Sequence, residues 1–158
     1  MRLCINMIVS IFIFVLGICG CNSAHKVKLS EVSTPAQATI QKLTEGGQIK
    51  MIEKETSNGK TIYDIEAIVK GKDVEYDIAE TGEVLSSEES VPYNSLPEAV
   101  KQAAEKYFGS SESLNAFKEI EENQTYYEVE GKKSGRNISL KLDQTGKILE
   151  EEKWFSAK

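Results

Sequence analysis

The feature that most constrains the fold is an internal repeat, in which the pattern that starts at Tyr63 returns at Tyr127. When the chain is shifted so that Tyr63 lies on Tyr127, residues 63–88 lie on residues 127–152, and seven of these 26 positions are identical. The identical pairs are Tyr63/Tyr127, Glu66/Glu130, Gly71/Gly135, Thr81/Thr145, Gly82/Gly146, Leu85/Leu149 and Glu88/Glu152. The matches fall on alternating positions and on turn glycines, so they predict two copies of one structural unit.

Each copy starts with a helical pattern. In the first copy Thr34 is expected to cap the helix, with Pro35 as its first residue. In the second copy Ser95 and Glu98 have the spacing of a capping box. Pro35 and Pro97 align at a slightly shorter offset than the strands, which predicts an insertion or deletion between the helices and the strands. The expected inner faces are Ala36, Ile40 and Leu43 in the first helix and Leu96, Val100, Ala103 and Tyr107 in the second.

Four short strands are expected after each helix because apolar and polar residues alternate between turn signals. The expected strands are 48–56, 61–69, 73–79 and 83–88 in the first copy, and 114–121, 125–131, 136–143 and 147–155 in the second. The sequence therefore predicts an α+β fold of two tandem repeats, residues 33–90 and 95–155, each with one helix packed on a four-stranded antiparallel meander. The two units could pack edge to edge or helix to helix.

The N-terminal segment, residues 1–20, predicts export. Residues 8–18 form an apolar run of 11, which is too short for a membrane span of about 20 residues and typical of a signal peptide. The following segment Ile18-Cys19-Gly20-Cys21 resembles the lipobox of bacterial lipoproteins, in which the last cysteine is lipidated and becomes the new N-terminus. We expect a signal peptide over residues 1–20, lipidation at Cys21, and a polar tether over residues 21–32 that leads to the fold.

Charge limits the possible partners of the exported chain. Residues 1–20 contain one basic residue, Arg2, so the remainder has 18 Lys and Arg against 25 Asp and Glu, a net charge of −7. This balance argues against nucleic acid as a partner and permits a basic protein partner. The membrane is expected to be a partner through the lipid anchor alone.

No residue pattern predicts catalysis, a cofactor or a metal. The only histidine, His25, falls in the expected tether, and no cysteine follows Cys21. The acidic runs 119–122 and 150–152 lack the spacing of a calcium loop, and we interpret them as solvated surface. We therefore expect a protein that is not an enzyme and that has no catalytic, cofactor-binding or metal-binding residues.

The pattern resembles the PepSY-like group, which is related in architecture to the β-lactamase inhibitory protein. The resemblance rests on residues 96–100, 127–130 and 142–149, and on residues 63–66 and 78–85 in the first copy. It implies an exported protein that binds or restrains peptidases or other extracytoplasmic proteins, and it carries over no contact residue.

The leading hypothesis is an exported, lipid-anchored, non-catalytic protein-binding module on the periplasmic or cell-surface side of the envelope, which restrains or inhibits a peptidase or another envelope protein. The alternative is a structural or small-ligand-binding envelope lipoprotein, with an apolar cavity between helices and sheet. The candidate partner contacts lie on one exposed aromatic and on two hairpins. They are Tyr126, Asn58, Gly59, Thr81 and Gly82.

Overall fold

The computed structural model describes residues 24–57 and 59–154, which form nine strands, two α-helices and two short 3-10 helices. The elements in chain order are β1 (His25–Lys26), η1 (Leu29–Glu31), α1 (Thr34–Leu43), β2 (Gln48–Ser57), β3 (Lys60–Val69), β4 (Lys72–Ala79), β5 (Val84–Ser90), η2 (Tyr93–Ser95), α2 (Glu98–Phe108), β6 (Asn115–Glu121), β7 (Gln124–Lys133), β8 (Arg136–Asp143) and β9 (Ile148–Trp154). The expected α+β class is confirmed.

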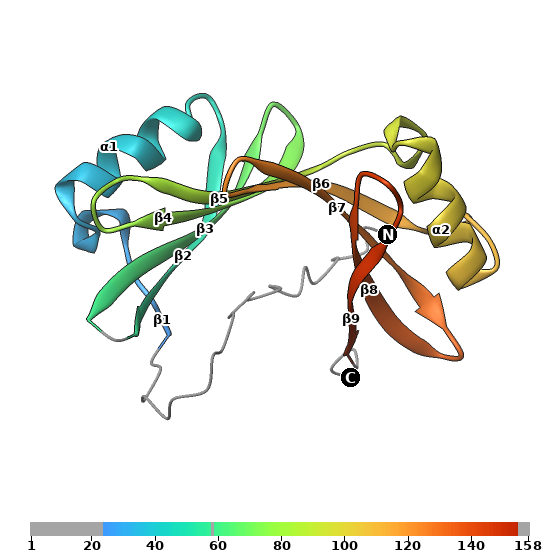
Figure 1. Cartoon of the computed structure of the whole chain (residues 1–158). Coiled ribbons are helices and arrows are strands. Elements are labelled where there is room, and N and C mark those ends of the chain that lie inside the picture. Colours follow the sequence, from blue (N-terminus) through green and yellow to red (C-terminus); the bar gives the residue numbers. More distant parts are fainter. Residues whose placement is uncertain (1–23, 58, 155–158) are drawn as a thin grey trace.

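All nine strands belong to one antiparallel sheet, in which the strand order equals the chain order. The central pair is β5 and β6, in which Ser86 lies opposite Glu121 and Ser90 opposite Phe117. The sheet therefore continues from one half of the chain into the other through paired strand edges. Figure 1 shows this sheet as a bent ribbon of strands with α1 near one end and α2 near the other.

Helix α1 packs on the first strands of the sheet. Ala36 and Ile40 are one helical turn apart, and both are fully buried. They belong to a cluster made of Val32, Ala36, Ile40, Ile52, Tyr63, Ile65 and Ile78. The Tyr63 ring lies inside this cluster, and its hydroxyl accepts a hydrogen bond from the Ser33 N–H at 3.1 Å, so the ring is buried without an unpaired polar atom.

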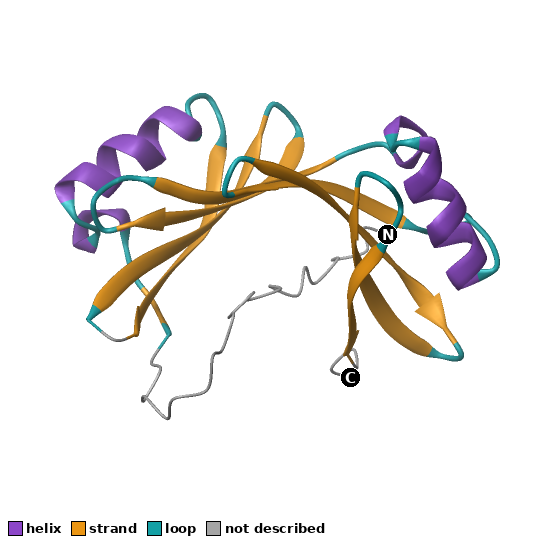
Figure 2. Cartoon of the chain, in the orientation of Figure 1, coloured by secondary structure: helices purple, strands orange, loops and turns teal. Residues whose placement is uncertain are grey.

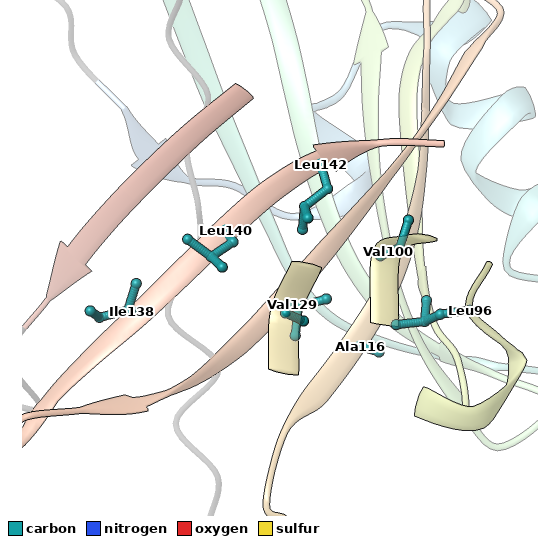
Figure 3. Packing of buried hydrophobic residues seen from close by; sticks show 8 residues of the cluster. Leu96, Val100, Ala116, Val129, Ile138, Leu140 and Leu142 are labelled. Atoms are coloured by element: carbon teal, nitrogen blue, oxygen red, sulfur yellow. The ribbon is translucent and has the colours of Figure 1, made fainter. Parts of the chain in front are cut away.

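Helix α2 packs in the same way on the later strands. Val100 and Ala104 are fully buried and face Val129, Leu140 and Leu142 of strands β7 and β8. Figure 3 shows side chains of this cluster gathered between helix and sheet. At roughly 1.5–3 kcal/mol for each buried aliphatic side chain, this layer is a main source of stability for this half.

The buried positions of the two halves keep one constant offset, the same that places Tyr63 on Tyr127. Val32 and Leu96, Ala36 and Val100, Ile40 and Ala104, and Ile78 and Leu142 are the other pairs that lie in corresponding places in the two clusters. The offset extends through the helices, so the expected insertion or deletion between the helices and the strands is wrong. Pro35 therefore corresponds to Ala99 and not to Pro97. The Pro35 carbonyl lies against Gly82, and the Ala99 carbonyl lies against Gly146.

Two glycine turns touch the helices at these corresponding positions. A Cβ on Gly82 would lie 2.8 Å from the Pro35 carbonyl oxygen, and a Cβ on Gly146 would lie 2.3 Å from that of Ala99. Both glycines also have a positive φ, 86° and 80°. Only glycine satisfies both requirements, which explains its presence in both turns.

The expected helix caps are wrong. Helix α1 includes Thr34, and its cap residue Ser33 uses its hydroxyl to donate to the Glu80 carbonyl at 2.6 Å. Ser95 lies in η2 and donates to the Pro92 carbonyl instead of capping α2. Competing acceptors in nearby loops take both hydroxyls, which local sequence patterns do not reveal.

The expected tether over residues 21–32 is partly wrong as well. His25 and Lys26 form strand β1 beside β2, and Val32 is buried in the cluster under α1. Apolar Val27 and Leu29 pack against the same cluster, which holds this segment on the fold. The expected signal peptide and Cys21 lie outside the described residues. Among the helices that the structure describes, none has the length and apolar character needed to cross a bilayer.

Both helices lie against the same face of the sheet, on the outside of its bend (Figure 2). The strand register supports this arrangement. Tyr63 and Tyr127 pack toward α1 and α2, and the pairing of β3 through β7 places both side chains on the same face of the sheet. We call the opposite side of the sheet the open face. No described helix covers it.

Candidate binding face

The open face carries a row of glutamates that runs across four neighbouring strands. Glu66 on β3 lies opposite Glu75 on β4, which lies opposite Glu88 on β5, which lies opposite Glu119 on β6. Directly opposed residues on one face are about 5 Å apart, so the row spans about 15 Å. Like charges in such positions destabilise a sheet, which makes four in succession unusual.

A second row runs parallel to the first. Its acidic members are Glu53, Asp64 and Asp77 on β2, β3 and β4, and Glu121 on β6, with Ser86 of β5 between them. The Ser86 hydroxyl donates to the Asp77 carboxylate at 2.7 Å. We call the two rows together the carboxylate rows.

Two carboxylate oxygens in the rows are buried without a hydrogen-bond partner among the described residues, Oε1 of Glu66 and Oδ1 of Asp64. The whole Glu66 residue is only 7% exposed. A buried polar atom without a partner costs about 1–3 kcal/mol. The described part of the free protein therefore lacks hydrogen-bond donors for these two oxygens.

Burial and mutual repulsion raise the pKa values of these carboxyls. Desolvation, followed by the charges of Asp64 and Asp77, raises the pKa of Glu75 to about 9. Desolvation, followed by Asp77 and Glu66, raises the pKa of Asp64 to about 7. Part of the carboxylate rows is therefore protonated at neutral pH in the free protein.

Glu88 and Glu128 form a hydrogen-bonded carboxyl pair near the middle of the open face. Burial and the charge of Glu128 raise the pKa of Glu88 to about 10, and burial raises the pKa of Glu128 to about 7. The protonated Glu88 therefore donates to the Glu128 carboxylate, which also accepts from the Ser139 hydroxyl. The pair shares one proton in the way that close carboxyls do.

Lys141 provides a cation at the end of the first row. It is 6% exposed, and its Nζ lies 3.0 Å from the Glu119 carboxylate and 2.8 Å from that of Glu121. Burial alone would lower the pKa of Lys141, but hydrogen bonds to Glu121 and Glu119 outweigh it and raise the pKa. Its Nζ also lies 4.7 Å from the centre of the Tyr126 ring. Lys141 therefore pairs with carboxylates at one end of the row, whereas Glu66, Glu75 and Glu88 form no ion pair among the described residues.

The predicted contact residues fall in different places. Tyr126 stands on the open face, opposite Glu119, and its hydroxyl donates to Gln124 at 3.0 Å. Asn58 lies outside the described residues, and Gly59 lies in a turn where an added Cβ would have no contact within 4 Å. Thr81 is exposed, but Gly82 packs against α1, where its carbonyl accepts from the Thr39 hydroxyl at 2.8 Å. A contact between any of these residues and a partner stays a prediction.

Sequence reasoning missed the carboxylate rows. The acids on alternate positions, such as Asp64 and Glu66 or Glu75 and Asp77, were a visible signal. The sequence predicts solvated surface for the run 119–122, whereas Glu119 is 8% exposed and bonded to Lys141. Within residues 24–57 and 59–154, no three histidine, cysteine or acidic side chains are arranged to hold a metal ion.

The two apolar clusters lie in the helix–sheet layers, where the small-ligand alternative expects a cavity. A hollow of about 390 Å³ lies instead at the strand ends beyond α2. Phe108, Leu114, Glu130, Gly131 and Lys132 are among its lining residues.

This architecture, with two helices on one face of a long antiparallel meander and an open opposite face, defines a class of α+β proteins. A family model described as "Putative beta-lactamase-inhibitor-like, PepSY-like" matches residues 61–150, which is more than half of the chain. The chain belongs to this PepSY-like family. The resemblance seen in the sequence is confirmed.

Solved structures share the fold. A BLIP-like protein of Bacteroides fragilis has 19% identity and a TM-score of 0.54, with 80% of this chain and 89% of that chain covered. A DUF2874 family protein of Bacteroides ovatus has 13% identity and a TM-score of 0.58, with coverages of 77% and 87%. One of the "putative periplasmic proteins" of Bacteroides eggerthii has 14% identity and a TM-score of 0.57, with coverages of 77% and 88%. No curated protein matches the chain.

Proposed function

We propose that the chain is a non-catalytic protein-binding module of the cell envelope, and that its open face receives the partner. The observation that carries this proposal is the open face itself, with its row of glutamates directly opposite one another on four strands. A sheet face with unpaired buried carboxylate oxygens is energetically unfavourable alone, and donors from a partner would satisfy them. Membership of an inhibitor-like family supports a binding role.

The class of partner follows from the family description. An inhibitor-like family supports a partner that is itself an enzyme of the envelope, such as a peptidase, which this module would restrain. Tyr126, beside the row and near the Lys141 ammonium, is the aromatic anchor that such an interface would use.

Export and lipid anchoring belong to the same proposal. The apolar run 8–18 and the segment that ends at Cys21 support them, and the structural relative from Bacteroides eggerthii is described as periplasmic. Mass spectrometry of the mature N-terminus should find an acylated Cys21, and Cys21→Ala should release the protein from membranes. An unmodified N-terminus upstream of Cys21 would remove this part of the proposal.

A tandem duplication is the proposed origin of the two halves. The constant offset between buried positions, and between the glycine turns that touch the helices, supports it. In an experimental structure, residues 33–90 should superpose on residues 97–154 with that offset throughout. A different offset in any strand would contradict the duplication.

Photo-crosslinking in cells tests the binding proposal. A photoreactive residue at Tyr126, on the open face, should capture a protein. The same residue at Lys42, which is exposed on α1 and therefore on the other side of the sheet, is the matched control and should not capture it. Capture at Lys42 alone, or at neither position, would contradict the proposed binding face.

A further inference from the structure

We propose that the surface bound by the open face is cationic, so that lysine or arginine side chains of the partner protein enter the carboxylate rows between Glu66 and Glu88. This inference rests on the proposed function, because it names the chemistry of the partner of the same face. Two observations carry it: the run of directly opposed carboxyls that form no ion pair among the described residues, and the unpaired buried oxygen of Glu66.

The carboxyls that the cations would contact form no ion pair with another described residue. Lys141 pairs with Glu119 and Glu121 at the β6 end of the rows. Near β3 and β4, the ion pair that the described residues form beside the rows joins Lys50 and Asp73, at the edge of the face. This distribution of ion pairs leaves Glu66, Glu75 and Glu88 of the first row available to cations of a partner protein.

Oxygen Oε1 of Glu66 points to a donor that the free protein lacks. It is buried and has no hydrogen-bond partner among the described residues, in a residue that is 7% exposed. An ammonium or guanidinium group carries three to five N–H donors and compensates both the charge and the missing hydrogen bond. A chelated metal fits less well, because no three histidine, cysteine or acidic side chains of the described residues are arranged to hold one.

Protons are the competitors for these cations. Glu75 is faced by Glu66 on β3 and by Glu88 on β5, with Asp64 and Asp77 in the next row. The other charged groups that act on the face are Glu53, Glu55, Asp73, Glu119, Glu121, Glu128, Lys26, Lys50 and Lys141. Because the free rows hold protons at neutral pH, the arrival of cations lowers their pKa values and releases protons. Binding should therefore strengthen as pH rises from 6 to 8.

Calorimetric titration of the full chain in detergent with an octalysine peptide tests the inference. We expect binding that releases protons, as measured in two buffers of different ionisation enthalpy, and that weakens at least about tenfold between about 0.05 and 0.5 M salt. The variant Glu75→Gln/Glu88→Gln should bind at least about tenfold more weakly. Burial disfavours the ionised form of both carboxyls, and glutamine does not ionise, so this variant should remain folded. Circular dichroism will verify its fold.

The control variant Glu45→Gln/Glu112→Gln makes the same two carboxyl-to-amide replacements at exposed positions away from the face and should bind as the wild type does. Equal binding by all three proteins, or equal weakening in both variants, would overturn the inference. Spermine or Ca²⁺ saturating the site as tightly as octalysine would also overturn it, in favour of a small-cation site. A protein captured at Tyr126 without any octalysine binding would remove the cationic partner and leave the proposed function standing.

Discussion

Replacing Glu75 by glutamine should make the protein more stable at neutral pH. The pKa of Glu75 is raised from 4.5 to about 9, so its carboxyl stays protonated in the folded protein while it ionises in the unfolded chain. The stability that this group contributes is complete below pH 4.5 and is lost as pH rises toward 9. At about 1.36 kcal/mol per pH unit, the loss reaches about 3 kcal/mol at pH 7.

Glutamine mimics the protonated carboxyl and does not ionise, so Glu75→Gln should recover much of this loss. Solvent around the partly exposed side chain reduces the gain to about 1–3 kcal/mol at pH 7. Below pH 4.5 both proteins carry a neutral group, and the difference in the free energy of unfolding should approach zero.

Urea unfolding followed by circular dichroism at pH 4, 7 and 8.5 measures the effect, with Glu45→Gln as a control at an exposed position. The gain should grow from pH 4 to pH 8.5 for Glu75→Gln and stay near zero for Glu45→Gln. A Glu75→Gln variant that is less stable than the wild type at pH 7, or whose gain does not depend on pH, would refute the reasoning.

Other substitutions test the contacts around the sheet. Gly146→Ala should destabilise the fold by about 2–4 kcal/mol, because its Cβ would lie 2.3 Å from the Ala99 carbonyl oxygen, while Gly135→Ala, with a similar φ and open space, should cost only about 1 kcal/mol. Equal thermal shifts for the two would argue against the close contact. Lys141→Met should cost about 3 kcal/mol at pH 8 because it leaves the buried Glu119 without its cation, and less at pH 5, where Glu119 can take up a proton. A loss that is larger at pH 5 in urea unfolding would contradict this role of Lys141.

Alternating apolar residues and turn glycines were sufficient to predict the strands to within a few residues. Tyr63, Ile65 and Ala67 point toward the core as their spacing of two requires, and all three are buried. Strand β1 escaped prediction because two residues, His25 and Lys26, are too few to show a period.

The carboxylate rows could not be predicted because they depend on register across several strands. The pairing of Glu66 with Glu75 depends on the turn at Lys70 and Gly71, which fixes the alignment of β3 and β4. The pairing of Glu88 with Glu119 depends on a contact between strands that are separated by helix α2. Sequence patterns describe which face a residue takes, but the neighbours across strands come from the tertiary fold.

Capture of the partner from the envelope by the carboxyl-to-amide variants tests the central claim most directly. The full chain and the control Glu45→Gln/Glu112→Gln should each retain the same protein at pH 7.5, and the protein should be lost with Glu75→Gln/Glu88→Gln, because only that variant lacks the glutamates in the middle of the open face. Retention of the same protein by all three chains would contradict the account.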